Sequence, residues 1–271
     1  MKLPKLIASD LDGTLVPEGA PALPEGLVAL LDEVQALGIP FAVSSGRQAD
    51  SLRRVFAPLA QPPLIMALNG GVLMRGEELL MEDPMPRKAA LEIALAAAQR
   101  PDVWVILETA DECWVLGSGS PLRQLLEQRQ YHVRVIDDLD EVQGEIIKVA
   151  CYTQRDPDAL ERWALSCRRE GIKAARSGSV WVDFNVADKG RGIRAACAVL
   201  GITPDEVMAF GDNLNDAAML DAAGEGYAVA GSLLAETGAC PVCPSVEAVL
   251  EKICAEAKKH LQSDRSCGII L

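Results

Sequence analysis

The 271-residue chain is acidic but otherwise has an ordinary globular composition. Hydrophobic residues make up 49% and charged residues 24%, which excludes a disordered or fibrous protein. With 26 basic and 39 acidic residues the formal net charge is −13, and this bulk charge argues against nucleic acid or an anionic membrane surface as a partner. A small anionic substrate is not excluded, because one local site can oppose the field of the whole molecule.

Targeting and metal-binding patterns are weak in this sequence. The apolar stretch after Lys5 is short and runs into acidic residues, which is not typical of a signal peptide, and no apolar run approaches the ~18 residues of a membrane span. We therefore expect a cytoplasmic protein with no membrane partner and with reduced cysteines. Cys240 and Cys243 form a CxxC pair, but no second pair follows at the spacing of a zinc site.

The first part of the chain alternates strand-like and helix-like segments. Short apolar runs at 5–10, 39–45 and 63–69 predict buried strands. Apolar residues at helical spacing predict helices over 27–37, which Gly38 ends, and over 47–56. This order of elements is typical of a parallel sheet with helices on its faces.

The rhythm changes at Val72, where 72–82 is typical of a hairpin and DPMPRK then places two prolines close together. The next hundred residues predict helices near 86–100, 121–130 and 157–170, and strands near 103–108, 113–116, 132–136, 146–153, 172–176 and 180–185. Paired strands separated by single helices indicate an α+β module with a largely antiparallel sheet.

After Asp188 the alternation of strands and helices returns. Helices are expected at 189–201, 215–223 and 246–260, and strands at 206–212 and 227–230, while the tail from 263 receives no assignment. The simplest interpretation is one α/β core, formed by 1–83 and 187–271, that is interrupted by an α+β module at 84–186.

Two acidic motifs follow predicted strands. Asp10 and Asp12 close the first strand, and residues two apart on a strand point to one face, so both can meet one ligand at the strand's carboxyl end. The segment 211–216, GDNLND, offers carboxylate and amide oxygens of the kind that Mg²⁺ prefers. Each motif has a plain structural alternative, an acidic turn for the first and a helix N-cap for the second. Two acidic strand ends in one sheet favour the metal site.

Three further features are weaker when taken singly. Ser45, within SSGR at 44–47, indicates an anion seat at a helix N-terminus, although simple capping explains it as well. Lys189 could hold a phosphoryl oxygen or be an ordinary surface lysine. Asn69 follows a strand and could meet a substrate or serve only as a turn residue.

Together these motifs resemble the haloacid dehalogenase superfamily of phosphohydrolases, whose four motifs appear in order as DLDGT, the Ser of SSGR, the Lys of DKG, and GDNLND. The inserted module resembles the type-IIB cap of the Cof-like branch. The resemblance implies a Rossmann-like parallel-sheet core over 1–83 and 187–271, with a cap domain over 84–186 that determines substrate specificity. Exposed polar cap residues such as Arg123, Arg176 and Asp183 could contact the substrate or could simply be surface residues.

The resemblance also implies catalytic and metal-binding roles. Asp10 would attack phosphorus to give an aspartyl-phosphate, and Asp12 would act as general acid and then as general base. Mg²⁺ would be held by the Asp10 carboxylate, the Asp12 backbone carbonyl and Asp212, with Asp216 assisting.

The remaining motif positions are expected to bind the transferring phosphoryl group and the substrate. Ser45, Gly46 and Lys189 would neutralise the phosphoryl group, and Asn215 would position the phosphate or Lys189. Substrate contacts by Arg47 and Asn69 are weaker expectations.

The function expected is therefore a Mg²⁺-dependent phosphatase acting on a small phosphorylated metabolite such as a sugar phosphate. A phosphomutase of the phosphomannomutase type shares DxDGT and a similar cap, but the compact GDNLND lacks the insertion in which those enzymes resemble one another. A non-catalytic binding protein on the same fold is the third alternative, and no motif position is lost that would favour it.

Overall fold

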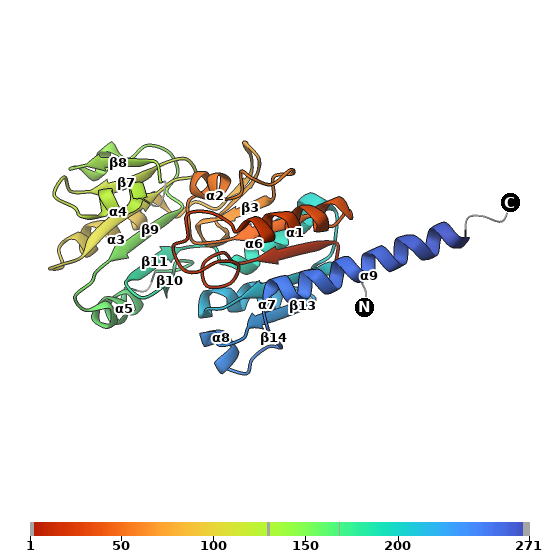
Figure 1. Cartoon of the computed structure of the whole chain (residues 1–271). Helices are drawn as coiled ribbons and strands as arrows, with labels where there is room; N and C mark the ends of the chain where they lie inside the picture. The colour runs from red at the N-terminus through yellow and green to blue at the C-terminus, as the bar shows by residue number, and fades with distance from the viewer. Residues whose placement is uncertain (1–2, 129–130, 168, 268–271) are drawn as a thin grey trace.

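The computed structural model describes residues 3–128, 131–167 and 169–267, which contain two separate sheets (Figure 1). The larger core sheet has the strand order β14-β13-β12-β1-β2-β3-β4-β5. Neighbouring strands from β14 to β3 are parallel, and β4 and β5 extend the sheet as an antiparallel hairpin. The strands are β1 (Leu6–Ser9), β2 (Phe41–Ser44), β3 (Leu64–Ala67), β4 (Val72–Arg75), β5 (Glu78–Glu82), β12 (Val207–Gly211), β13 (Glu225–Val229) and β14 (Val242–Cys243).

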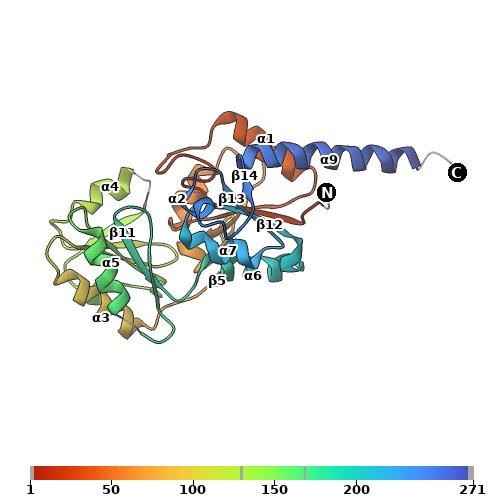
Figure 2. The same ribbon diagram turned by 90° about the horizontal axis from the view of Figure 1, so that it is seen from below.

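Helices cover both faces of the core sheet, so its central strands are apolar throughout (Figure 2). Alternate side chains of β1 enter different clusters: Ile7 packs toward one face, and Leu6 and Ala8 pack toward the other. The first face is covered by α1 (Glu25–Ala36), α2 (Ala49–Val55) and α9 (Val246–Cys267), and the second by α6 (Lys189–Leu200), α7 (Ala217–Ala222) and α8 (Leu233–Glu236).

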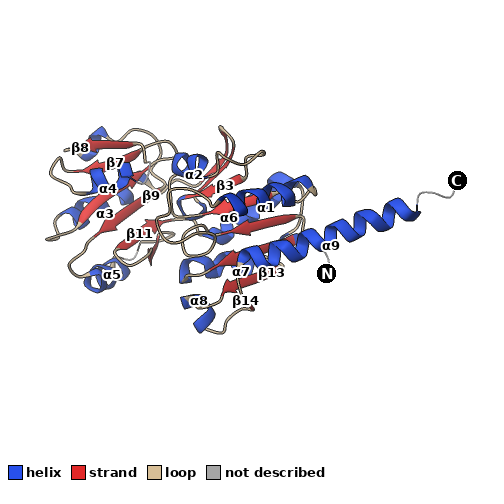
Figure 3. Cartoon of the chain, in the orientation of Figure 1, coloured by secondary structure: helices blue, strands red, loops and turns tan. Residues whose placement is uncertain are grey.

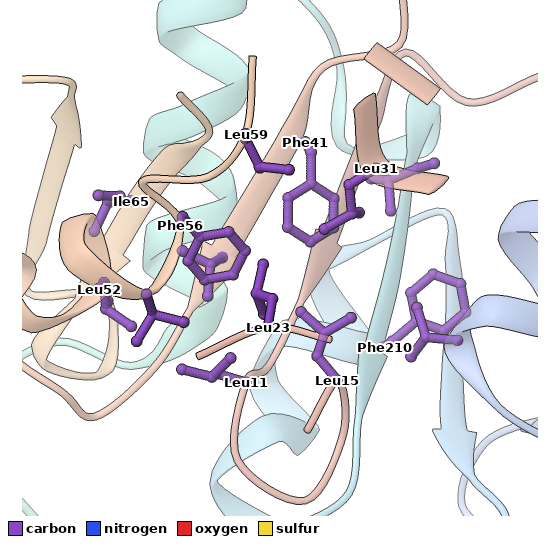
Figure 4. Close-up of a cluster of buried hydrophobic side chains, with 14 of the residues drawn as sticks. Leu11, Leu15, Leu23, Leu31, Phe41, Leu52, Phe56, Leu59, Ile65 and Phe210 are labelled. Carbon is purple, nitrogen blue, oxygen red and sulfur yellow. The ribbon is translucent and has the colours of Figure 1, made fainter. Parts of the chain in front are cut away.

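The first of these clusters anchors the chain at the end of β1 (Figure 4). Leu11, which lies between the two acids of the first motif, is fully buried in this cluster. Nearby, the rings of Phe41 and Phe56 lie 6.1 Å apart between centroids. Because Leu11 is held in the core, the flanking Asp10 and Asp12 are fixed at the carboxyl edge of the sheet.

The second sheet, which we call the cap sheet, has the order β10-β11-β9-β6-β7-β8 and is antiparallel except for the β7–β8 pair (Figure 3). Its strands are β6 (Trp104–Glu108), β7 (Cys113–Leu116), β8 (Val133–Ile136), β9 (Lys148–Tyr152), β10 (Lys173–Arg176) and β11 (Trp181–Asn185). Helices α3 (Arg87–Ala98) and α5 (Pro157–Ser166) pack on one face, and α4 (Leu122–Gln128) packs on part of the other.

Several element boundaries differ from those expected from the sequence. The helix expected from 215 is preceded by a 3₁₀ turn, Leu214–Asp216, which the Asn213 side chain caps by accepting from the Leu214 N–H. Helix α9 continues beyond 260 to Cys267, since no glycine or proline interrupts it before Gly268. Other 3₁₀ turns are Leu68–Gly70, Leu139–Glu141 and Pro204–Glu206. Within the described ranges, no helix is both long and apolar enough to cross a membrane.

Helices α6 and α7 approach each other closely at Gly190. A Cβ atom at this position would overlap the backbone carbonyl of Ala218 in α7. This close approach brings the N-terminus of α6 to the carboxyl edge of the core sheet.

We expect Gly190→Ala to destabilise the fold by ~1–3 kcal/mol, because the added methyl group meets rigid backbone. Gly26→Ala is the matched control, since Gly26 is also the second residue of a twelve-residue helix but has open space around it. The control should gain up to ~1 kcal/mol from helix propensity. Urea unfolding measures both changes, and equal effects of the two substitutions would contradict the close approach.

Candidate active site

The two acidic motifs meet at the carboxyl edge of the core sheet. Strands β1 and β12 are parallel neighbours in register, with Ser9 opposite Phe210, and the Asp10 N–H donates to the Phe210 carbonyl at 2.9 Å. One carboxylate oxygen from each of Asp10, Asp212 and Asp216 lies within 4.8 Å of the other two. The strand register therefore brings together acids that are two hundred residues apart in the chain.

Lys189 lies between two of these carboxylates. Its Nζ is 2.5 Å from Asp10 Oδ1 and 2.5 Å from Asp216 Oδ1, and its side chain is 1% exposed. Lys189 is the first residue of α6, and Asp188 caps this helix by accepting from the Arg191 N–H. Burial alone would lower the pKa of Lys189, but the charges of Asp10 and Asp216 outweigh it and raise the pKa, so the ammonium stays charged.

The cluster has more negative than positive charge. Burial raises the pKa of Asp10 well above its usual range, the neighbouring Asp216 and Asp212 raise it further, and Lys189 opposes the shift. Burial also raises the pKa of Asp212. Apart from these shifts, the cluster itself has three carboxylates and one ammonium group. A site with this deficit of positive charge and with oxygen donors fits a hard divalent cation.

Hydrogen bonds to the backbone and to Thr14 orient the acids of the second motif. Asp216 Oδ2 accepts the N–H groups of Asp212 and Asn213, both at 3.0 Å, which shapes the 211–216 loop. Thr14 Oγ1 donates to Asp212 Oδ1 at 2.7 Å. Gly13 has φ +89°, and a Cβ there would lie 2.5 Å from Asp212 Oδ2, so both backbone conformation and space require glycine.

Asp12 is paired with Arg47, which the sequence analysis assigned to substrate contact. Arg47 Nε lies 2.7 Å from Asp12 Oδ2, and its Nη2 lies 2.5 Å from Asp12 Oδ1. The Gly19 N–H also donates to Asp12 Oδ1, at 2.7 Å. This bidentate pair fixes the orientation of the Asp12 carboxylate. Nothing in the local sequence indicates it, because the partners are 35 residues apart.

The segment that follows β2 lies beside these acids. Ser45 Oγ accepts the Arg47 N–H at 3.2 Å, and the Ser45 N–H donates to the Met66 carbonyl. Ser45 and Gly46 line the same cavity as Asp10, whereas Ser44 belongs to β2 and is fully buried. The geometry thus places Ser45, not Ser44, at the cavity.

The cap sheet supplies the opposite wall of this cavity, which has a volume of about 180 Å³. Asn69 Nδ2 donates to Asp183 Oδ2 at 3.0 Å, and Lys148 Nζ donates to the Gly46 carbonyl at 2.8 Å, so two hydrogen bonds join the core segments to the cap sheet beside the acids of the two motifs. The cavity is lined by Asp10, Asp12, Gly13, Glu18, Ser45, Gly46, Arg47, Ile106, Glu108, Leu126, Tyr131, Lys148, Ala150, Ser177, Gly178, Trp181, Asp183, Asp212, Asn213 and Asn215.

Sequence reasoning missed Glu108 and Lys148. Glu108 is the last residue of β6 and Lys148 is the first residue of β9, and both strands are otherwise apolar. A charged residue at the end of an apolar strand is the signal that could have found them. Of the three cap residues named as possible substrate contacts, Asp183 is buried, not exposed, and lines the cavity. Arg123 instead pairs with Glu127 on α4, and Arg176 pairs with acids of α5.

Comparison with known proteins identifies the family. Residues 7–233 match the model of the haloacid dehalogenase-like hydrolases, and the chain belongs to this family. The family predicted from the four motifs is confirmed, and with it the enzyme class, phosphoric monoester hydrolase.

Curated relatives cover most of the chain. It is 26% identical over 232 residues to the 5-amino-6-(5-phospho-D-ribitylamino)uracil phosphatase of Escherichia coli K12, a match that spans 83% of this chain and 84% of the relative. It is 27% identical over 227 residues to the phosphoglycolate phosphatase of Methanopyrus kandleri, spanning 83% and 84%.

Solved structures confirm the fold class. A haloacid dehalogenase-like hydrolase from Bacteroides thetaiotaomicron matches with a TM-score of 0.79 at 21% identity, over 92% of this chain and 99% of that one. A sugar phosphatase of subclass IIB of the superfamily matches with a TM-score of 0.75 at 19% identity, over 95% and 99%. The predicted α/β architecture with a parallel-sheet core is therefore correct.

We expect Lys189→Met to destabilise the metal-free protein by ~3–5 kcal/mol, because Asp10 and Asp216 lose their buried counter-charge. Lys5→Met is the control: Lys5 pairs with Glu206 at 2.7 Å, but its side chain is 60% exposed, so its removal should cost less than about 1 kcal/mol. Chemical unfolding in a chelator measures both. Similar losses in the two variants would show that Lys189 does not neutralise the cluster.

Proposed function

We propose that this member of the haloacid dehalogenase-like hydrolase family is a Mg²⁺-dependent phosphatase acting on a small phosphorylated metabolite, with a sugar phosphate as the first candidate substrate. The observation that carries the proposal is the convergence of Asp10, Asp212 and Asp216 around Lys189, at the edge of a cavity that the cap sheet closes. Carboxylates would repel a phosphate ester unless added cations offset their charge.

The donor set supports Mg²⁺. Asp10 and Asp212 present carboxylate oxygens. Asp12, whose backbone carbonyl would be a further oxygen ligand, lies two residues after Asp10 in the chain. Asp216 is already engaged by Lys189 and two backbone N–H groups, which supports an orienting role for it beside the metal. When bound, Mg²⁺ would neutralise phosphoryl charge and lower the repulsion between ester and carboxylates.

In the proposed mechanism Asp10 is the nucleophile. A carboxylate oxygen of Asp10 forms a bond to phosphorus as the ester P–O bond breaks, and Asp12 gives a proton to the leaving oxygen. Asp12 then takes a proton from the water that attacks the aspartyl-phosphate, which releases phosphate and restores Asp10. In the structure both Asp12 oxygens bind Arg47, so Asp12 has to release Arg47 before it can exchange a proton with the leaving oxygen.

Lys189 and the segment after β2 support binding of the phosphoryl group. The Lys189 ammonium contacts Asp10 itself, so it lies where negative charge develops during transfer. Ser45, Gly46 and Asn215 line the same cavity and can offer hydrogen bonds to phosphoryl oxygens. Asn69 contacts Asp183 of the cap sheet, which supports a role at the side of the cavity where the leaving group would lie.

The small cavity and the relatives support a compact substrate. The curated relatives are named for phosphatases of a ribitylamino-uracil phosphate and of phosphoglycolate, and a subclass IIB neighbour in structure is a sugar phosphatase. All three names describe small molecules. A cavity of about 180 Å³ suits a ligand of that size better than a macromolecular chain.

We expect phosphate release from at least one small phosphate monoester in the presence of Mg²⁺, its loss in EDTA and its return when excess Mg²⁺ is added. Asp10→Asn should lower kcat by about three orders of magnitude or more, because it removes the nucleophile. Asp111→Asn, at an exposed cap position outside the cavity, is the control and should retain activity. A colorimetric phosphate assay over a panel of sugar, polyol and acid phosphates measures these effects.

Two results would contradict the proposal. Phosphate release that EDTA does not affect would contradict the proposed dependence on a metal ion. Full activity of Asp10→Asn would contradict the proposed role of Asp10 as the nucleophile. Turnover that requires an added sugar bisphosphate and transfers phosphate within the sugar would instead identify a phosphomutase.

A further inference from the structure

Three charged side chains of the cap sheet face the catalytic acids across the cavity. Glu108, Lys148 and Asp183 come from adjacent strands β6, β9 and β11, with Glu108 opposite Lys148 in the strand register. Their side chains are 2%, 5% and 5% exposed. Burying three charges is costly, so a set of this kind in the wall of a cavity points to a role in ligand recognition.

Lys148 balances only part of the negative charge around it. Its Nζ donates to the Gly46 carbonyl at 2.8 Å and lies 2.6 Å from Glu108 Oε2 and 3.5 Å from Asp183 Oδ2. Two buried carboxylates therefore share one ammonium group, and this part of the wall keeps a net negative charge.

Arg47 is paired with a carboxylate of its own, so the pair adds no net charge to the cavity. Its Nε and Nη2 bind Asp12, and Nη2 also contacts the Ala20 carbonyl at 3.1 Å. Lys148 and Arg47 are the cationic side chains among the described residues that line the cavity. Away from the catalytic acids, that lining adds the carboxylates of Glu18, Glu108 and Asp183.

The carboxylates on this wall have room for further hydrogen-bond donors. Each carboxylate offers about four lone-pair positions, more than Lys148 and Asn69 fill on Glu108 and Asp183. The wall is thus matched to a ligand that donates hydrogen bonds and carries no negative charge.

We propose that Glu108 and Asp183 form a leaving-group subsite that selects phosphate monoesters with an uncharged, hydroxyl-bearing leaving group and rejects those with a second anionic group. This inference rests on the proposed phosphatase function and names the chemistry of its substrate. Hydroxyl groups of a sugar or polyol donate to the carboxylates, whereas a carboxylate or second phosphate on the leaving group meets like charge in a desolvated space.

Pairs of esters that differ by one group test the selection. Glycerol 3-phosphate is paired with 3-phosphoglycerate, erythritol 4-phosphate with 4-phosphoerythronate, and sorbitol 6-phosphate with 6-phosphogluconate. In each pair a terminal CH₂OH becomes a carboxylate while the transferable phosphate is the same. We measure their binding to the full-length Asp10→Asn protein with Mg²⁺ by calorimetry, and kcat/KM with the unaltered enzyme.

We expect the neutral member of at least one pair to bind at least about tenfold more tightly than its acid, with the same order in kcat/KM. Equal or reversed preference in every pair that binds would overturn the subsite while leaving the phosphatase function intact. Binding of no ester would also overturn the subsite, and absence of turnover despite selective binding would overturn the proposed function alone.

Two variants assign the selection to the named residues. Asp183→Asn and Glu108→Gln keep the shape of the side chain but remove one negative charge each. Each should improve binding of the acidic ester and so narrow, at least severalfold, the ratio of the affinity for the neutral ester to the affinity for the acidic ester. Glu161→Gln, on α5 at the other face of the cap sheet, is the matched control and should leave the ratio unchanged. A ratio that stays the same in both cavity variants, with folding verified by circular dichroism, would overturn the assignment.

Discussion

The ion pairs of Lys189 with Asp10 and Asp216 are the interactions on which the site depends. They join three parts of the chain, the end of β1, the start of α6 and the loop after β12, at distances of 2.5 Å. An inserted cap separates the first of these parts from the other two in sequence. A buried ammonium group is stable only beside negative charge, and the two carboxylates likewise need a cation, so each partner fixes the others in place.

The balance of charge around Lys189 explains how an acidic protein can accept a phosphate ester. One ammonium cannot neutralise three carboxylates, and the raised pKa of Asp10 reflects that shortage together with its burial. A divalent cation would bring the net charge of this cluster to zero and so remove its repulsion of the phosphoryl group. The negative charges of Glu108 and Asp183 then act on the leaving group alone, because they lie on the cap side of the cavity.

The sequence allowed the parallel sheet and the meeting of the two acidic motifs to be predicted, because both follow from local regularities. The apolar segment before Asp10 and the one before Asp212 each indicate a buried strand, and parallel strands place their carboxyl ends at one edge. The Arg47–Asp12 pair and the Lys148–Gly46 hydrogen bond could not be predicted in this way. Each joins groups whose proximity arises only from the packing of distant segments, and the second joins the Lys148 side chain of the cap sheet to a backbone carbonyl of the core.

The central claim, that the carboxylate of Asp10 becomes covalently phosphorylated, is tested most directly by rapid acid quench of the enzyme during turnover of a good phosphate ester with Mg²⁺. Proteolysis and mass spectrometry then locate the phosphoryl group. The account predicts a hydroxylamine-labile phosphoryl group on Asp10 that appears within the first turnover and is absent from Asp10→Asn. Steady turnover with no labelled protein at any quench time, or a label on a residue other than Asp10, would contradict it.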